Sequence, residues 1–139
     1  MPLLPPTLHS IAVRPRTWWT LLVIWWVTLW FLSGTAHPPS LPGFLDWDKL
    51  KHAVYFMLGG SFWALALRLQ KPHLRTLIIA LTGAALMTVV GFFDEWHQMF
   101  TPGRSGNDPG DWIADTIGGV LGPWVGLGCQ RLLRLRPIK

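Results

Sequence analysis

The stretch that most strongly suggests chemistry is residues 94–104, which reads DEWHQMFTPGR. Asp94 and Gln98 are one helical turn apart and share a helix face, whereas the adjacent Glu95 is predicted to point in another direction. Both carboxylates follow an apolar run and lie where the negative end of the helix dipole disfavours acids. Something else must therefore stabilise them: a basic side chain, a bound cation, or a continuation of the helix past the membrane edge. Arg104 in the following loop is the obvious partner for one of these acids.

A second set of polar residues begins near residue 48. Asp48, His52 and Tyr55 are spaced i, i+4 and i+7, so they share one face of a helix that begins near Asp48. Lys49 adds a cation beside them. An acid in the first turn of a helix also suits the positive end of the dipole, so a simple capping role for Asp48 is an alternative.

A third set of polar residues opens the last apolar segment. Asp111 and Asp115 are one turn apart, and the same i+4 steps continue through Gly118, Gly122 and Gly126. A stripe of small residues favours close helix packing, so both carboxylates are expected to face other helices, with residues 59–60 as a facing surface. Within a membrane a carboxylate costs about 2.5–3.5 kcal/mol at the bilayer centre, which means that Asp115 needs a partner.

Four apolar segments must position these three sets. They cover about residues 17–33, 52–69, 74–95 and 111–133, and each approaches the ~20 residues that a helix needs to cross a bilayer. Only 14% of the residues are charged, against about 25% in soluble domains. Because backbone groups cannot stay unpaired in lipid, each segment is predicted to be helical. The chain is thus expected to be all-α, an integral membrane bundle of four transmembrane helices.

The predicted organisation is an N-terminal arm without regular structure over residues 1–16 and one membrane domain over residues 17–139. Arginines, an apolar stretch and small residues near the N-terminus also resemble a signal peptide. The apolar stretch is long and contains bulky tryptophans, which are unusual in a signal peptide, so we expect a retained helix.

Charge is distributed unequally between the two sides of the predicted bundle. Nine of the twelve basic residues flank one side, in the N-terminal arm, the connection around residues 68–75 and the C-terminus. Basic residues beside spans mark the cytoplasmic side, so both termini are predicted to be cytoplasmic and nucleic acid is not an expected partner. The other, extracytoplasmic side receives all the acids, namely Asp46, Asp48, Asp94, Glu95, Asp108, Asp111 and Asp115.

Three interpretations of this polar set remain open. The first is an ion-pair network that only holds the bundle together, or charges that are merely hydrated at the membrane edge. The second is a site for a divalent cation, with Asp94, Asp111 and Asp115 as candidate ligands that could hold a lipid pyrophosphate. The third is a recognition site for an anionic group. No strong catalytic motif occurs in the sequence, so it does not identify an enzyme.

Two of these interpretations assign roles to particular side chains. In a recognition site, Arg104, Lys49 and His52 would meet the anionic group of a cell-envelope component. In an enzyme acting on a lipid-linked phosphate or pyrophosphate, His52 or Glu95 would be the acid or base.

Three sequence blocks resemble the signature of VanZ-like membrane proteins. The first block, DKLKH at 48–52, follows the pattern D-K-x-x-H. The second, DEWHQMFTPGR at 94–104, follows D-E-x-x-Q-x-[FY]-x-x-x-R, and the third, DWIADTIGGVLG at 111–122, follows D-x-x-x-N-x-x-G. The blocks occur in this order. The chain has Asp115 where the pattern usually has Asn. An acid there adds charge to the site, which requires either its protonation or more cationic surroundings. The positions that match the pattern are Asp48, Lys49, His52, Asp94, Glu95, Gln98, Arg104, Asp111 and Gly118.

The resemblance implies a multi-pass protein of the bacterial plasma membrane. The family's namesake is associated with low-level resistance to teicoplanin, a glycopeptide antibiotic that binds peptidoglycan precursors outside the membrane. The expected partners are membrane lipid and either a lipid-linked envelope precursor or the glycopeptide. A structural accessory subunit is the remaining alternative. The predicted polar site comprises Asp48, Lys49, His52, Tyr55, Asp94, Glu95, Gln98, Arg104, Asp111 and Asp115.

Overall fold

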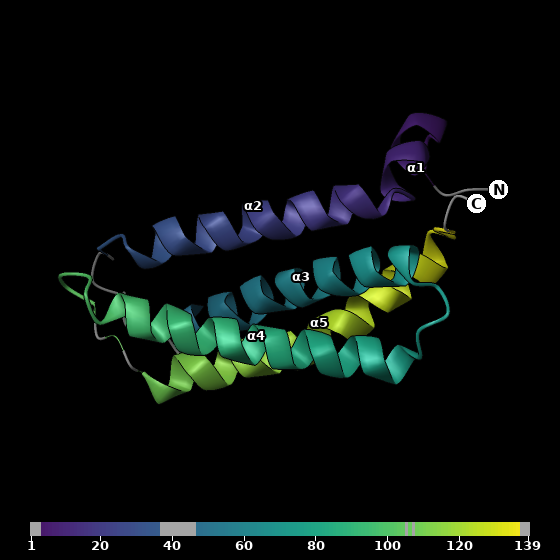
Figure 1. Ribbon diagram of the computed structural model, residues 1–139. Helices are drawn as coiled ribbons and strands as arrows, with labels where there is room; N and C mark the ends of the chain where they lie inside the picture. Colours follow the sequence, from purple (N-terminus) through teal and green to yellow (C-terminus); the bar gives the residue numbers. More distant parts are fainter. Residues whose placement is uncertain (1–3, 37–46, 105, 107, 137–139) are drawn as a thin grey trace.

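The computed structural model describes residues 4–36, 47–104, 106 and 108–136, which form helices and no strand. The all-α prediction is therefore confirmed for this part of the chain (Figure 1). The five helices are α1 (Pro6–Ala12), α2 (Pro15–Ser33), α3 (Trp47–Gln70), α4 (Thr76–Gln98) and α5 (Pro109–Leu132).

The four predicted helical segments correspond to α2, α3, α4 and α5. The largest difference is the start of α3, which begins at Trp47 rather than near residue 52. The helix therefore includes the second set of polar residues, as the spacing from Asp48 indicated. The prediction of an N-terminal arm without secondary structure was wrong, because α1 occupies residues 6–12. Pro6 opens this helix, where a proline is favourable because its missing N–H would have no helical partner.

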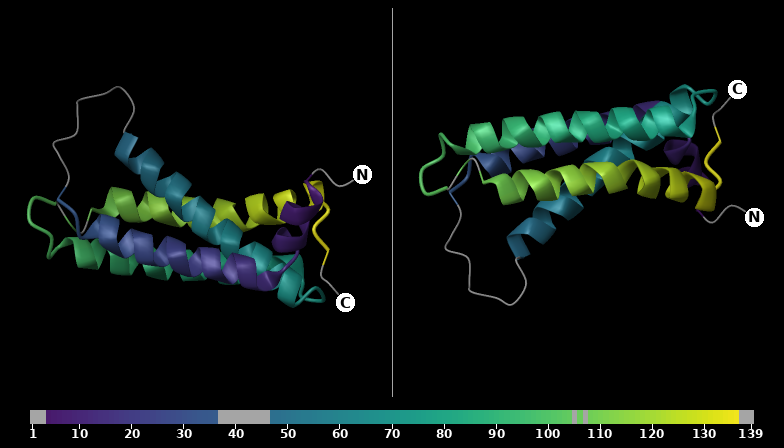
Figure 2. Two further views of the ribbon diagram at one scale, coloured as in Figure 1. Left: turned by 90° about the horizontal axis from the view of Figure 1, so that it is seen from above. Right: turned by 90° about the horizontal axis from the view of Figure 1, so that it is seen from below.

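The four long helices run in alternating directions. Consequently α1, the α3–α4 connection and the C-terminal end of α5 lie at one end of the bundle (Figure 1). The opposite end, here called the polar end, contains the first turns of α3 and α5, the last turns of α2 and α4, and the α4–α5 connection. α3 crosses the other long helices at an angle, so its N-terminal turns diverge from α2 and α4 (Figure 2).

The closest helix contact joins α3 and α5 through the predicted glycine stripe. A Cβ on Gly126 would lie 2.6 Å from the backbone oxygen of Ser61, and Gly118 and Gly122 approach backbone oxygens of α3 even more tightly. Gly60 faces the same stripe, as predicted, whereas a Cβ on Gly59 would collide with the Trp25 ring of α2. Small residues therefore let the backbone of α5 lie directly against that of α3.

α2 packs on the other face of α3 through aromatic side chains. Trp25, Leu29, Phe56 and Met87 form a buried cluster between α2, α3 and α4. The Trp25 Nε1–H donates to the Tyr55 carbonyl at 2.9 Å, and the Tyr55 hydroxyl donates to the Trp25 carbonyl at the same distance. These reciprocal bonds fix the register of α2 against α3.

The outer surface of the bundle is strongly apolar. Large side chains such as Phe31, Leu81 and Phe92 are 70%, 60% and 58% exposed. By length and composition, α4 is the helix among the described residues that could cross a membrane. α2 is rich in tryptophan, α3 begins with charged residues and α5 is rich in glycine. Four membrane spans and cytoplasmic termini therefore stay predictions.

The glycine stripe generates a stability prediction. Gly122→Ala should lower the melting temperature of the detergent-solubilised protein, because the added methyl forces α3 and α5 apart and overpacking costs about 1–3 kcal/mol. Gly128→Ala is the matched control, since a Cβ at this position of α5 meets nothing within 4 Å. Equal melting temperatures for the two variants would contradict close α3–α5 packing.

Candidate functional site

All ten predicted site residues lie at the polar end. α3 contributes its first three turns, α4 its last two, α5 its first two, and the α4–α5 connection contributes Arg104. The described acids all lie at this end, whereas Asp46 lies outside the described residues. The structure divides the set into an ion bridge between α3 and α5, a buried cluster around His52, and a pocket between α2, α3 and α4.

Lys49 forms the ion bridge. Its Nζ lies 2.6 Å from Asp108 Oδ2 and also donates to Asp111 Oδ1. The hydrogen bond from Lys49 lowers the pKa of Asp108, and the Gly110 N–H, which donates to Asp108 Oδ1 at the start of α5, lowers it further. Burial alone would lower the pKa of Lys49, but its bonds to the two aspartates raise it above its ordinary value. Lys49 therefore joins the first turn of α3 to the start of α5 through these two ion pairs.

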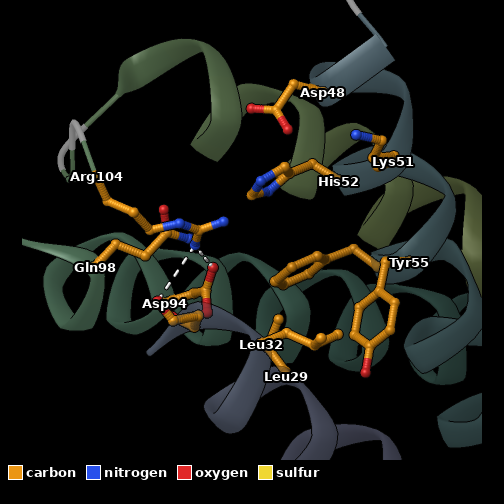
Figure 3. A pocket seen from close by; sticks show the side chains of 11 residues that line it. Leu29, Leu32, Asp48, Lys51, His52, Tyr55, Asp94, Gln98 and Arg104 are labelled. Carbon is orange, nitrogen blue, oxygen red and sulfur yellow. Dashed lines mark hydrogen bonds between the residues drawn. The ribbon is translucent and has the colours of Figure 1, made fainter. Parts of the chain in front are cut away.

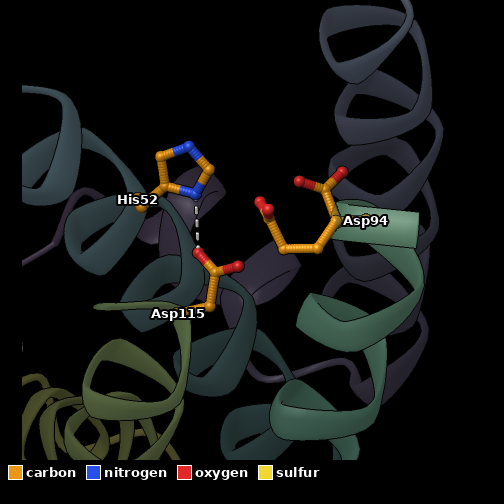
Figure 4. A group of neighbouring side chains, drawn as sticks. His52, Asp94 and Asp115 are labelled. Carbon is orange, nitrogen blue, oxygen red and sulfur yellow. Dashed lines mark hydrogen bonds and ion pairs between the residues drawn. The ribbon is translucent and has the colours of Figure 1, made fainter. Parts of the chain in front are cut away.

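His52 is the centre of a buried cluster, defined here as His52, Asp94, Glu95 and Asp115. His52 Nδ1 lies 2.9 Å from Asp115 Oδ1 (Figure 4). Each of the four side chains offers a nitrogen or carboxylate oxygen within 4.8 Å of the others. The prediction that Glu95 points away from Asp94 was therefore wrong, since both reach the same cluster.

A second group shares His52 with this cluster. Asp48, His52 and Asp111 also offer ligand atoms within 4.8 Å of one another, and His52 Nε2 lies 3.9 Å from Asp111 Oδ2. The three aspartates predicted as metal ligands are consequently divided: Asp94 and Asp115 belong to the buried cluster, and Asp111 belongs to this group.

Hydrogen bonds orient the cluster carboxylates. Gln98 Nε2 donates to Asp94 Oδ2 at 2.6 Å, and the backbone N–H of Asp108 donates to Glu95 Oε2 at 2.7 Å. The other oxygen of Glu95 and Oδ2 of Asp115 are buried without a hydrogen-bond partner among the described residues. Such atoms are costly unless something outside the chain satisfies them.

Sequence reasoning missed several residues that build the polar end. The Ser33 carbonyl, which ends α2, accepts hydrogen bonds from Thr101 Oγ1 at 3.2 Å and from Arg104 Nη1 at 3.4 Å. A Cβ at Gly91 would lie 2.9 Å from Asp115 Cβ, so this glycine makes room for the acid. An isolated glycine three residues before Asp94 was the available signal.

His97 lies apart from the buried cluster. Its Nδ1 is 3.1 Å from Ser33 Oγ, and its ring stacks on Trp30 with the centroids 3.8 Å apart. His97 lies three residues after Asp94 in α4, but its ring contacts α2 rather than the carboxylates. Of the two histidines, His52 and His97, it is therefore His52 that faces the carboxylates.

A pocket of about 350 Å³ opens between the diverging turns of α3 and the ends of α2 and α4 (Figure 3). One wall is apolar and is formed by Leu29, Leu32, Phe56 and the ring of Tyr55. The other wall is polar and is lined by Ser33, Asp48, Lys51, His52, Asp94, Gln98 and Arg104. The lysine of the pocket is Lys51 rather than the predicted Lys49.

Comparison with known proteins gives one match. The VanZ/LLP1 family model matches residues 11–130, which is most of the chain. No curated protein and no solved structure matches the chain significantly.

The ion bridge generates a mutational prediction. Lys49→Met should destabilise the protein by about 1–3 kcal/mol, because it leaves Asp111, which is only 6% exposed, without its cation. Adding Asp111→Asn should restore part of this loss, and Lys71→Met at the opposite end of the bundle should have little effect. Thermal denaturation in detergent measures all three. A double variant no more stable than Lys49→Met would contradict this role for Lys49.

Asp108 generates a prediction about pH. Because its pKa is lowered on folding, its carboxylate contributes stability above its ordinary pKa of 3.8, and this is lost as the pH falls through the folded value. The wild type should therefore be more stable than Asp108→Asn at neutral pH, and the difference should vanish in acid. Melting temperatures from about pH 3 to pH 7 test this. A difference independent of pH would assign the effect to helix capping.

Proposed function

The chain belongs to the VanZ/LLP1 family, and on this basis we propose that it is a bacterial membrane protein of the cell envelope whose pocket binds an anionic lipid-linked component. The resemblance to VanZ suggests the consequence. A peptidoglycan precursor held at the outer leaflet would be less available to teicoplanin, so binding would lower susceptibility to the antibiotic. This function does not require a reaction at the site.

The observation that carries the proposal is the two-sided pocket. Leu29, Leu32 and Phe56 offer an apolar wall to an alkyl or isoprenyl chain. Arg104 and Lys51 offer cations on the polar wall, and a guanidinium is well suited to phosphate because it donates several hydrogen bonds from one plane. An anionic amphiphile fits both walls, whereas a fully polar or fully apolar ligand would use one.

The distribution of apolar side chains supports the membrane location. Exposed apolar side chains cover the outer faces of α2, α4 and α5, and lipid would cover them favourably. A soluble protein rarely exposes so large an apolar surface.

The distribution of charge supports the proposed orientation. The arginines at the start of α2, Arg14 and Arg16, and the basic side chains of the α3–α4 connection and of the end of α5 lie opposite the polar end, which would place the polar end outside the membrane. There the pocket would meet the outer leaflet, where envelope precursors are exposed to glycopeptides.

Arg104→Ala tests this function. We expect at least a tenfold weaker affinity of the purified protein for farnesyl pyrophosphate, which carries an isoprenyl chain and a pyrophosphate, because a charge-assisted contact is lost. Uncharged farnesol should bind weakly to both proteins. In cells, Arg104→Ala should also abolish any protection from teicoplanin at unchanged membrane expression. Arg131→Ala, an exposed arginine near the end of α5, is the matched control.

A charge exchange separates ligand binding from a structural role. Arg104 acts electrostatically on Asp94, so Arg104→Asp combined with Asp94→Arg keeps an attractive pair but moves the cation to α4. Under the proposal this double variant folds but does not bind the pyrophosphate. If the double variant protects cells from teicoplanin as well as the wild type does, the structural accessory subunit is favoured. If Arg104→Ala binds farnesyl pyrophosphate with unchanged affinity, the pocket is rejected as the binding site.

A further inference from the structure

Three helices bring four potential metal ligands together at the polar end. His52 comes from α3, Asp94 from the last turns of α4 and Asp115 from α5 (Figure 4). Glu95 follows Asp94 in α4. Their ligand atoms lie within 4.8 Å of one another, and the three carboxylates are 6%, 4% and 0% exposed. Side chains from three helices thus surround one buried point.

The charges within this cluster do not balance. Three carboxylates face one imidazole. Of the nearby cations, Lys49 binds Asp108 and Asp111 outside the cluster, and Arg104 acts on one cluster carboxylate, Asp94. Buried carboxylates need compensating positive charge at short range. A shared proton or a bound cation can provide it, and the hydrogen bonds of the cluster favour the cation.

Those hydrogen bonds leave two oxygens available. Glu95 uses Oε2 to accept from the Asp108 N–H, and Asp115 uses Oδ1 to contact His52. Glu95 Oε1 and Asp115 Oδ2 are buried and have no hydrogen-bond partner among the described residues. In metal sites a carboxylate commonly binds the ion with one oxygen while a hydrogen bond orients the other.

We propose that His52, Asp94, Glu95 and Asp115 bind a divalent transition-metal cation, Mn²⁺ or Zn²⁺. Three carboxylates with one imidazole form a mixed oxygen and nitrogen donor set. Imidazole favours transition metals over Mg²⁺ and Ca²⁺, whereas carboxylates suit Mn²⁺ and are also accepted by Zn²⁺. The site needs only these four side chains, so it does not depend on the lipid-linked ligand proposed above.

The cation would also hold the polar end together. Its ligands belong to α3, α4 and α5, so one ion would join three helices where α3 diverges from α2 and α4. A ligand that binds only the folded protein raises its stability by mass action. Metal binding should therefore be visible as thermal stabilisation without any measurement of activity.

Metal binding to the full chain in detergent tests the proposal. After treatment with EDTA, the wild type should bind about one equivalent of Mn²⁺ or Zn²⁺ in equilibrium dialysis followed by metal analysis, in the absence of lipid. At about 100 times the Kd its melting temperature should rise by roughly 5 °C or more. Less than half an equivalent of both metals would overturn the proposal and would leave shared protons as the source of the balancing charge.

Two near-isosteric variants assign the ligands. Glu95→Gln and Asp115→Asn should each weaken binding at least tenfold and reduce the thermal stabilisation, because each removes the charge of a proposed ligand. Asp108→Asn is the control, since it removes a carboxylate of the same end that lies outside the cluster. Unchanged affinity in both cluster variants would overturn the assignment. If neither variant folds, the wild-type stoichiometry decides the proposal.

Discussion

The close approach of α5 to α3 is the constraint on which the rest of the structure depends. Gly118, Gly122 and Gly126 allow backbone contact that a single methyl group would prevent. This contact brings the first turns of the two helices together, so that Lys49 reaches Asp111 and His52 reaches Asp115. The glycines therefore position the polar residues, and without them the same charges would lie on separate helix surfaces.

The aromatic packing of α2 sets the size of the pocket. Trp25 and Tyr55 hold α2 against α3 through reciprocal hydrogen bonds, and Gly59 accommodates the Trp25 ring. Towards the polar end α3 diverges from α2 and α4 (Figure 2), and the pocket lined by Leu29, Tyr55 and Arg104 opens there. The pocket thus results from a firm contact near the middle of α2 and a crossing angle fixed by the α3–α5 contact.

The length of the apolar segments predicted the long helices, and helical spacing predicted much of the polar face, because i+4 periodicity follows from backbone geometry alone. Asp48, His52 and Tyr55 line one pocket as their spacing indicates, and the glycine stripe packs as expected. The sequence did not predict that Lys49 forms the ion bridge and that Lys51 lines the pocket, because this depends on how α3 is rotated about its axis against α5. The same holds for Glu95, whose position depends on the path of the α4–α5 connection, where Asp108 supplies its hydrogen bond.

The position of Asp94 and Glu95 at the unfavourable end of the α4 dipole can be understood from these contacts. The local cost is small, about 0.3–1 kcal/mol for a charge near a helix end, so tertiary interactions readily exceed it. Gln98 and the Asp108 N–H already hold one oxygen of each acid. A buried oxygen of Glu95 and another of Asp115 have no hydrogen-bond partner among the described residues, so the chain alone stabilises these acids incompletely. This deficit distinguishes the cluster from a self-sufficient ion-pair network and is what a bound cation would remove.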